Sequence, residues 1–101
     1  MDTNSLINHS RARFDHQAAR LTLKEKYQAK MIFGYRGGLF RTTPEMISFL
    51  SLYSGQTIVI LDLYENPIEV DALELLTQMK ERFQEQMNAR LAEIREQDQT
   101  R

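Results

Sequence analysis

The sequence predicts an α+β domain in which two long terminal helices flank a small antiparallel sheet with one short helix. Two observations predict this fold class. Residues 4–30 and 72–97 contain no glycine or proline and carry apolar residues at helical spacing. Between them lie four short runs rich in β-branched and aromatic residues, bounded by glycine, proline and asparagine. A helix start at Thr43 and Pro44 divides these runs into two pairs, so the expected element order is α-β-β-α-β-β-α.

Length and composition are those of a single domain, residues 1–101. Hydrophobic residues make up 42% and charged residues 27%, a mixture typical of globular rather than disordered chains. The absence of cysteine excludes disulfides and thiolate metal sites. The first ten residues lack the basic and apolar regions of a secretion signal. The longest apolar run, residues 57–63, is too short to span a bilayer, so we expect no membrane partner.

The first helix has the pattern of a basic amphipathic helix. Ile7, Phe14, Ala18 and Leu21 fall on one stripe at helical spacing, and Tyr27 extends this stripe approximately. Basic residues occupy much of the remaining surface. The stripe is therefore expected to face the rest of the molecule.

A β-hairpin is expected after this helix. Residues 30–35 and 39–42 are its two predicted strands. The turn between them contains Gly37 and Gly38, and glycine supplies the positive φ angles that a tight hairpin turn requires. The short helix that begins at Pro44 should end near Gly55, because glycine takes the left-handed conformation that closes helices.

The second pair of strands begins with the strongest strand signal in the chain. Residues 57–64 are rich in β-branched side chains and begin apolar on both faces, which is typical of a central strand. A short return strand is expected over residues 68–70. Asp71 then caps the last helix, and Glu74 three residues later completes a capping-box pattern.

The last helix, residues 72–97, carries one unbroken apolar stripe on an otherwise charged surface. At 1.5 Å per residue it is roughly 39 Å long, whereas a head formed by residues 31–71 should be only about 20 Å across. The two terminal helices are therefore expected to form a stalk, and the far end of the stripe needs cover. The predicted partner-binding residues are Met79, Phe83, Met87, Leu91 and Ile94.

Two kinds of cover are open for this stripe. Methionine is common where partners dock, because its side chain adapts to irregular surfaces, which favours another protein. Packing against the first helix is the intramolecular alternative. That helix offers only Phe14 and Leu21 as large apolar residues over its central turns, so its stripe is less apolar than the one it would cover.

Charge is distributed unevenly along the chain. Residues 1–43 contain eight basic and three acidic residues, a balance of +5, and residues 44–101 contain five and eleven, a balance of −6. The two halves either face each other within one fold, or the basic half meets an acidic partner such as nucleic acid or a neighbouring copy. The residues available for nucleic acid are Arg11, Arg20, Lys24, Lys30, Arg36 and Arg41. Aromatic residues of the first hairpin accompany some of them, but their alternation is typical of a core face.

The sequence shows no constellation that points to catalysis. His9 and His16 lie on the first helix without the third ligand that a metal site needs. Asp62 interrupts an apolar strand, and a buried carboxylate there is either a catalytic candidate or the place where the strand leaves the core. No second ionisable group is placed beside it by the sequence. We therefore expect no enzymatic activity, no cofactor and no metal.

Several strings of the sequence resemble small virion- and assembly-associated proteins of contractile-tailed bacteriophages, particularly those of cyanobacteria. The resemblance covers about two thirds of the chain, from Leu23 to Ala89. The strings that carry it occupy residues 23–30 (LKEKYQAK), 37–41 (GGLFR), 44–47 (PEMI), 60–67 (ILDLYENP) and 84–89 (QEQMNA). None of them is a catalytic or ligand-binding motif, so the resemblance implies a phage context and no particular site residue.

Together these patterns predict a structural or assembly protein of a tailed phage that acts through protein–protein contacts of its last helix. Its expected partners are other phage proteins or copies of itself, and its expected location is the virion or the host cytoplasm. The alternative is a nucleic-acid-binding accessory protein that uses the basic first helix and hairpin.

Overall fold

The computed structural model describes residues 3–99 of the chain, with side chains for residue 13 and residues 15–99. Its elements follow the order α-β-β-α-β-β-α, which confirms the predicted α+β class. The helices are α1 (Thr3–Lys30), α2 (Pro44–Leu52) and α3 (Ala72–Gln99), and the strands are β1 (Ile32–Tyr35), β2 (Gly38–Arg41), β3 (Thr57–Leu61) and β4 (Pro67–Asp71).

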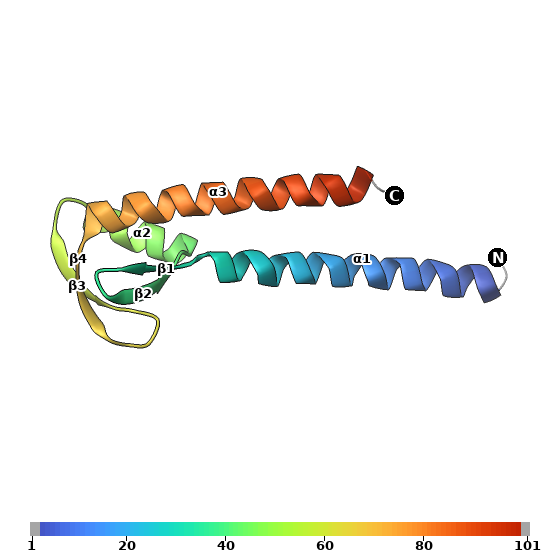
Figure 1. Ribbon diagram of the computed structural model, residues 1–101, viewed down its shortest axis with the longest axis horizontal. Coiled ribbons are helices and arrows are strands. Elements are labelled where there is room, and N and C mark those ends of the chain that lie inside the picture. Colours follow the sequence, from blue (N-terminus) through green and yellow to red (C-terminus); the bar gives the residue numbers. More distant parts are fainter. Residues whose placement is uncertain (1–2, 100–101) are drawn as a thin grey trace.

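The molecule is elongated, with two long helices leaving one small body side by side (Figure 1). Its extents are 65 × 25 × 21 Å, and its radius of gyration is 19.3 Å, compared with about 13 Å for a compact chain of 100 residues. We call the strands, α2 and the first turns of α3 (Ala72–Met79) the head. The stalk is α1 together with the rest of α3, and α1 extends further from the head than α3 does (Figure 1).

Both of the predicted helix caps are present. The Oγ1 atom of Thr43 accepts a hydrogen bond of 3.1 Å from the backbone N–H of Met46, and Pro44 takes the first position of α2. The Oδ1 atom of Asp71 accepts hydrogen bonds of 3.1 Å from two N–H groups in the first turn of α3. The carboxylate of Glu74 lies 3.7 Å from Arg36, so it forms an ion pair with the first hairpin.

The strands form two separate two-stranded antiparallel sheets, β1–β2 and β3–β4. The positive φ angles of the first turn belong to Arg36 (49°) and Gly37 (81°), which corrects the assignment of Gly38 to that turn. Gly38 is instead the first residue of β2, where glycine is needed for a different reason. A Cβ atom there would be only 2.8 Å from Cγ1 of Ile68, so the absence of a side chain lets the two hairpins approach each other.

The expectation that residues 57–64 form a central strand is wrong. β3 ends at Leu61, because Asp62 begins the turn to β4, and β4 is its only neighbouring strand in the described chain. The backbone–backbone hydrogen bond between the two hairpins lies past the end of β3, where the N–H of Leu63 donates to the carbonyl of Leu39 at 2.6 Å. β3 is therefore an edge strand.

The hydrophobic core lies within the head, between the two hairpins, α2 and the start of α3. Its fully buried large side chains are those of Leu50, Val70, Leu75 and Met79. Tyr35 and Phe40 of the first hairpin complete it, with their rings edge to face at 6.2 Å. The aromatic residues of this hairpin thus belong to the core, as their alternation indicates.

The face that α1 turns toward the molecule differs from the predicted stripe. Leu23, Tyr27 and Met31, each four residues apart, are buried, whereas Ala18 and Leu21 are exposed. Among the described side chains the predicted stripe is therefore right at Tyr27 and wrong at Ala18 and Leu21, while the side chains of Ile7 and Phe14 lie outside the described residues. The few large apolar residues of this helix fit more than one stripe, and the position of α3 selects the one that contains Leu23.

Candidate protein-binding surface

The apolar stripe of α3 divides into a buried and a half-exposed part. Met79 is fully buried in the core of the head, so it is not available to a partner, which corrects its place among the predicted binding residues. The other four predicted residues extend beyond the head along the stalk. We call them the distal stripe: Phe83, Met87, Leu91 and Ile94.

The distal stripe is only partly covered by the rest of the chain. Phe83, Met87 and Ile94 are half-buried, and Leu91 keeps 45% of its surface exposed. α1 runs alongside but contributes few large apolar side chains to this part of the stalk. In its second half only Leu23 and Tyr27 are buried. The stripe therefore retains apolar surface that a further helix or protein would cover.

A shallow groove begins where the distal stripe leaves the head. It lies between α2 and α3, has a volume of about 430 Å³, and mostly exposes apolar surface. Pro44 and Ile47 line it on α2, and Phe83 lines it on α3. The groove thus extends the distal stripe toward the N-terminus of α2 and provides a place for an apolar side chain of a partner.

Polar contacts hold α1 against the far half of α3. The carboxylate of Glu93 accepts hydrogen bonds from the Lys26 ammonium, at 2.7 Å, and from the hydroxyl of Tyr27. The hydrogen bond from Lys26, and next that from Tyr27, holds the pKa of the Glu93 carboxyl below its ordinary value. The same contacts with Glu93 raise the pKa of the Tyr27 hydroxyl and of the Lys26 ammonium above their ordinary values.

Two arginines support the ends of this helix pair. Arg20 of α1 forms an ion pair of 2.8 Å with Asp98 near the end of α3. Arg82 donates a hydrogen bond of 2.9 Å to the carbonyl of Lys30, at the C-terminus of α1, and its guanidinium lies 5.1 Å from the ring centroid of Phe33. A cation is favourable there because the C-terminus of a helix carries partial negative charge.

The predicted nucleic-acid residues do not act as one free basic group. Arg20 is paired with Asp98, and Arg36 lies 3.7 Å from the carboxylate of Glu74. Lys24 is exposed, and the ammonium of Lys30 lies 5.0 Å from the ring centroid of Tyr27. The side chain of Arg11 lies outside the described residues, and Arg41 lies beside a pocket at the base of α1.

The three ion pairs found between described residues all join the basic first half of the chain to the acidic second half. Arg20, Lys26 and Arg36 are the basic members. The predicted complementarity of the two halves therefore operates within the fold, along the antiparallel pair α1 and α3 and at the first hairpin.

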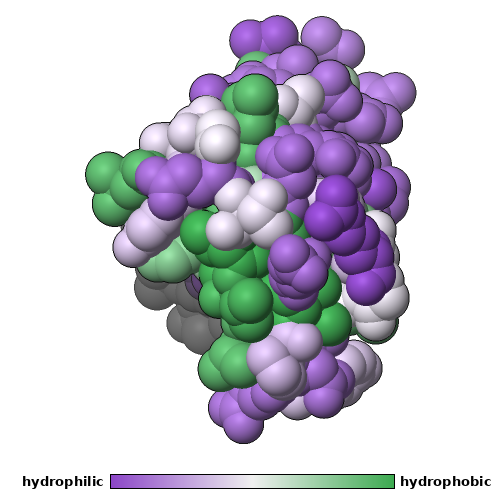
Figure 2. Space-filling view, turned by 90° about the vertical axis from the view of Figure 1, so that its left-hand side faces the viewer, coloured by the Kyte–Doolittle hydropathy of each residue, from purple (hydrophilic) through white to green (hydrophobic). Residues whose placement is uncertain are grey.

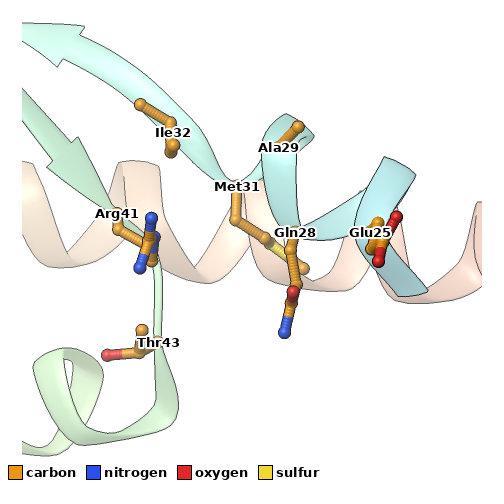
Figure 3. Close-up of a pocket in the computed structure, with 7 residues that line it drawn as sticks. All are labelled: Glu25, Gln28, Ala29, Met31, Ile32, Arg41 and Thr43. Atoms are coloured by element: carbon orange, nitrogen blue, oxygen red, sulfur yellow. The ribbon is translucent and has the colours of Figure 1, made fainter. Parts of the chain in front are cut away.

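The pocket beside Arg41 has a volume of about 450 Å³ and lies where α1, the first hairpin and the N-terminus of α2 meet (Figure 3). Glu25 of α1 lines one end and Arg41 of β2 the other, with Met31 and Gln28 between them in this view (Figure 3). The lining thus combines one positive charge, on Arg41, with one carboxylate, on Glu25. The lining therefore does not favour an anionic ligand such as a phosphate.

Asp62 organises the turn between β3 and β4. Its carboxylate accepts backbone hydrogen bonds from Asn66 (2.9 Å), Tyr64 (3.0 Å) and Leu39 (3.1 Å). The N–H groups of Asn66 and Leu39 are the largest causes that hold the pKa of this carboxyl below its ordinary value. An ionised carboxylate with these backbone partners stabilises the turn and ties it to β2, so of the two interpretations Asp62 fits the structural one.

β3 carries a second exposed apolar surface, which is not among the surfaces predicted from the sequence. Val59 and Leu61 keep 65% and 60% of their surface exposed, and Tyr64 just beyond keeps 70%. The signal was present as a run without charge at residues 57–61. Such a run is typical of a central strand, with a neighbouring strand on each side, but the described chain gives β3 a neighbour on one side only.

Comparisons with known protein families, with curated proteins and with solved structures found no match to this chain. Among the described side chains, those of residue 13 and residues 15–99, no three or more of histidine, aspartate or glutamate converge in a way that could hold a metal ion. None of the helices in the described chain is both long enough and apolar enough to cross a membrane.

Proposed function

We propose that this chain is a non-enzymatic structural or assembly protein of a tailed phage that acts through protein–protein contacts of α3. The observation that carries the proposal is the distal stripe, which leaves the head and keeps apolar surface along the stalk, with Leu91 45% exposed. The phage context rests on the resemblance described above. The partner is another protein of the particle or of its assembly, located in the virion or in the host cytoplasm.

The shape of the molecule supports this proposal. A rigid projecting helix pair presents a long side surface at low conformational cost, as in helix-in-groove recognition. The groove lined by Pro44, Ile47 and Phe83 lies at one end of that surface. Tyr27, Glu93 and Lys26 fix the two helices to each other, so the surface exists before the partner arrives.

Mass spectrometry of purified phage particles, and of assembly complexes captured with the chain, tests this function. The particles should contain the chain, or the complexes captured with the chain should contain other phage proteins. A variant that combines Leu91→Ser and Ile94→Ser should be depleted from the particles or should capture less of these proteins. The matched control Asn88→Ser, at an exposed polar position on the same helix, should behave like the unchanged chain. The proposal is contradicted if the particles lack the chain and the captured complexes lack other phage proteins, or if the variant with changes at Leu91 and Ile94 behaves like the unchanged chain.

Two methionines of α3 provide an internal measure of contact. Met79 is fully buried and Met87 is half-buried, so brief treatment of the free chain with peroxide should oxidise Met87 faster. In the captured complex the oxidation of Met87 should slow, while that of Met79 stays as it was. Unchanged oxidation of Met87 would show that the partner binds elsewhere.

A further inference from the structure

β3 exposes apolar side chains and one backbone edge together. Its odd-numbered residues Thr57, Val59 and Leu61 direct their side chains to the solvent, while Ile58 and Ile60 face the molecule and are half-buried. Figure 2 looks onto the end of the molecule that lies at the left in Figure 1, where β3 and β4 are found. Hydrophobic side chains gather in the middle of this face, with polar ones around them. The largest contiguous apolar patch on a small protein is often a functional surface.

The hydrogen-bond alternation shows which backbone groups of β3 are open. Gln56 accepts from the N–H of Ala72 at 3.1 Å, and the N–H of Asp62 donates to Asn66 at 2.9 Å. In an antiparallel ladder such pairs recur at every second residue, so the even-numbered residues of β3 bond to β4. The N–H and C=O groups of the odd-numbered residues therefore point to the opposite edge, where the described chain places no strand.

The outer edge of β4, on the side away from β3, is not open to pairing. Pro67 has no N–H group, the N–H of Asp71 donates to the hydroxyl of Tyr35 at 3.3 Å, and Glu69 between them carries a charge. Proline and charged residues are how natural edge strands avoid pairing with other chains. Residues 57–61 of β3 contain neither, so only one edge of this hairpin is free to pair.

We propose that β3 pairs antiparallel with β3 of a second copy of this chain, which joins the two hairpins into one four-stranded sheet. The open edge ends at Leu61, because Leu39 already bonds to the N–H of Leu63. The open residues 57–61 are centred on Val59, so a two-fold axis there places Val59 opposite its own counterpart. Thr57 and Leu61 then pair across the axis, giving about six backbone hydrogen bonds.

Three features favour a second copy as the occupant. The edge is uncharged, so two copies meet without repulsion between like charges. The open N–H and C=O groups belong to residues 57, 59 and 61, which are symmetric about Val59. In one antiparallel register, each open group of one copy therefore meets an open group of the other. Pairing also makes β3 a central strand, the position that its apolar, β-branched sequence indicates and that the single chain does not provide.

The pairing involves five residues of each chain and is expected to be weak, at the low end of the range for specific protein interfaces. It does not depend on the proposed function, because the distal stripe lies on the stalk and β3 lies on the head. Sedimentation velocity of the full chain should show a reversible monomer–dimer equilibrium that reaches mostly dimer near about 100 µM.

A matched pair of proline variants tests the edge itself. Val59 and Glu69 face each other in the register of the hairpin, and the N–H of each points away from the other strand. Val59→Pro removes a donor from the open edge and should weaken the dimer at least about tenfold. Glu69→Pro removes a donor from the blocked edge and should leave the dimer unchanged. Val59→Ala keeps the donor and should weaken the dimer less than Val59→Pro.

Amide hydrogen exchange of the wild-type chain provides a readout that does not depend on the folding of a variant. The N–H groups of Val59 and Leu61 should become protected as the chain concentration rises, whereas that of Glu69 should not. A chain that stays monomeric over the whole concentration range overturns the proposal. A dimer that survives Val59→Pro in a folded variant, or that leaves Val59 and Leu61 unprotected, overturns it as well.

Discussion

The two ends of α3 are built differently although they share one stripe. In the head, Leu75 and Met79 are fully buried among apolar neighbours. Along the stalk, Leu91 is 45% exposed, and the contacts with α1 are mainly those of Glu93 and Asp98 with polar and charged side chains. The difference shows that the head stabilises the fold by burial, while the stalk holds a surface in place with polar contacts and leaves its apolar residues accessible.

The largest expected effect comes from truncating one apolar side chain of α3 in the head and comparing it with the same change in the stalk. Met79→Ala removes a fully buried side chain and should lower the free energy of unfolding by about 2–5 kcal/mol. Leu91→Ala removes an exposed one and should change it by about 0.5 kcal/mol or less. Urea denaturation of the two variants measures the difference. Equal losses would mean that the stalk is packed as tightly as the head.

The contact between the two hairpins should give an intermediate effect. Gly38→Ala brings a Cβ atom to 2.8 Å from Ile68 and 3.3 Å from Asp62, and such overpacking typically costs about 1–3 kcal/mol. Gly34→Ala is the matched control, because its Cβ atom meets only the carbonyl of Gly38, at 3.8 Å. Thermal unfolding should separate the two. The double variant of Gly38→Ala and Ile68→Ala should lose less stability than the two single losses predict; strict additivity would place the strain elsewhere.

The smallest expected effect is the pH dependence of the stalk. The folded pKa of Glu93 is lowered, so its contribution to stability is complete above the ordinary value of 4.5 and is lost as pH falls below it through the folded value. Asp62 contributes in the same direction below its ordinary value of 3.8. Glu93→Gln should therefore reduce the fall in Tm that begins below pH 4.5, and the fall due to Asp62, which begins below pH 3.8, should remain.

The contact between Glu93 and Tyr27 makes stability fall as pH rises, which is opposite to the dependence at acid pH. The folded pKa of Tyr27 is raised, so its contribution is complete below the ordinary value of 10.0 and is lost as pH rises through the folded value. Tyr27→Phe should remove this alkaline decline. An unchanged pH profile in both variants would show that the helix pair does not depend on Glu93.

Local chemistry made much of the fold predictable. Thr43 and Asp71 cap their helices as expected because an N-cap depends on the side chain and on the few N–H groups that follow it. The two hairpins, the short helix and the stripe of α3 also follow from patterns within a few residues. Non-local contacts were harder: the role of Gly38 depends on Ile68, and the buried face of α1 depends on where α3 lies.

The sequence by itself therefore determined the order of the elements, the caps, the uncharged run of β3 and the residues that make up the stripe of α3. Only the tertiary structure decided that Met79 is core while Leu91 is surface, and that β3 lies at an edge. The physical reason is the same in both cases. Spacing along a helix or strand fixes which side chains share a face. Whether that face is covered depends on elements distant in sequence or, at β3, on the proposed second copy.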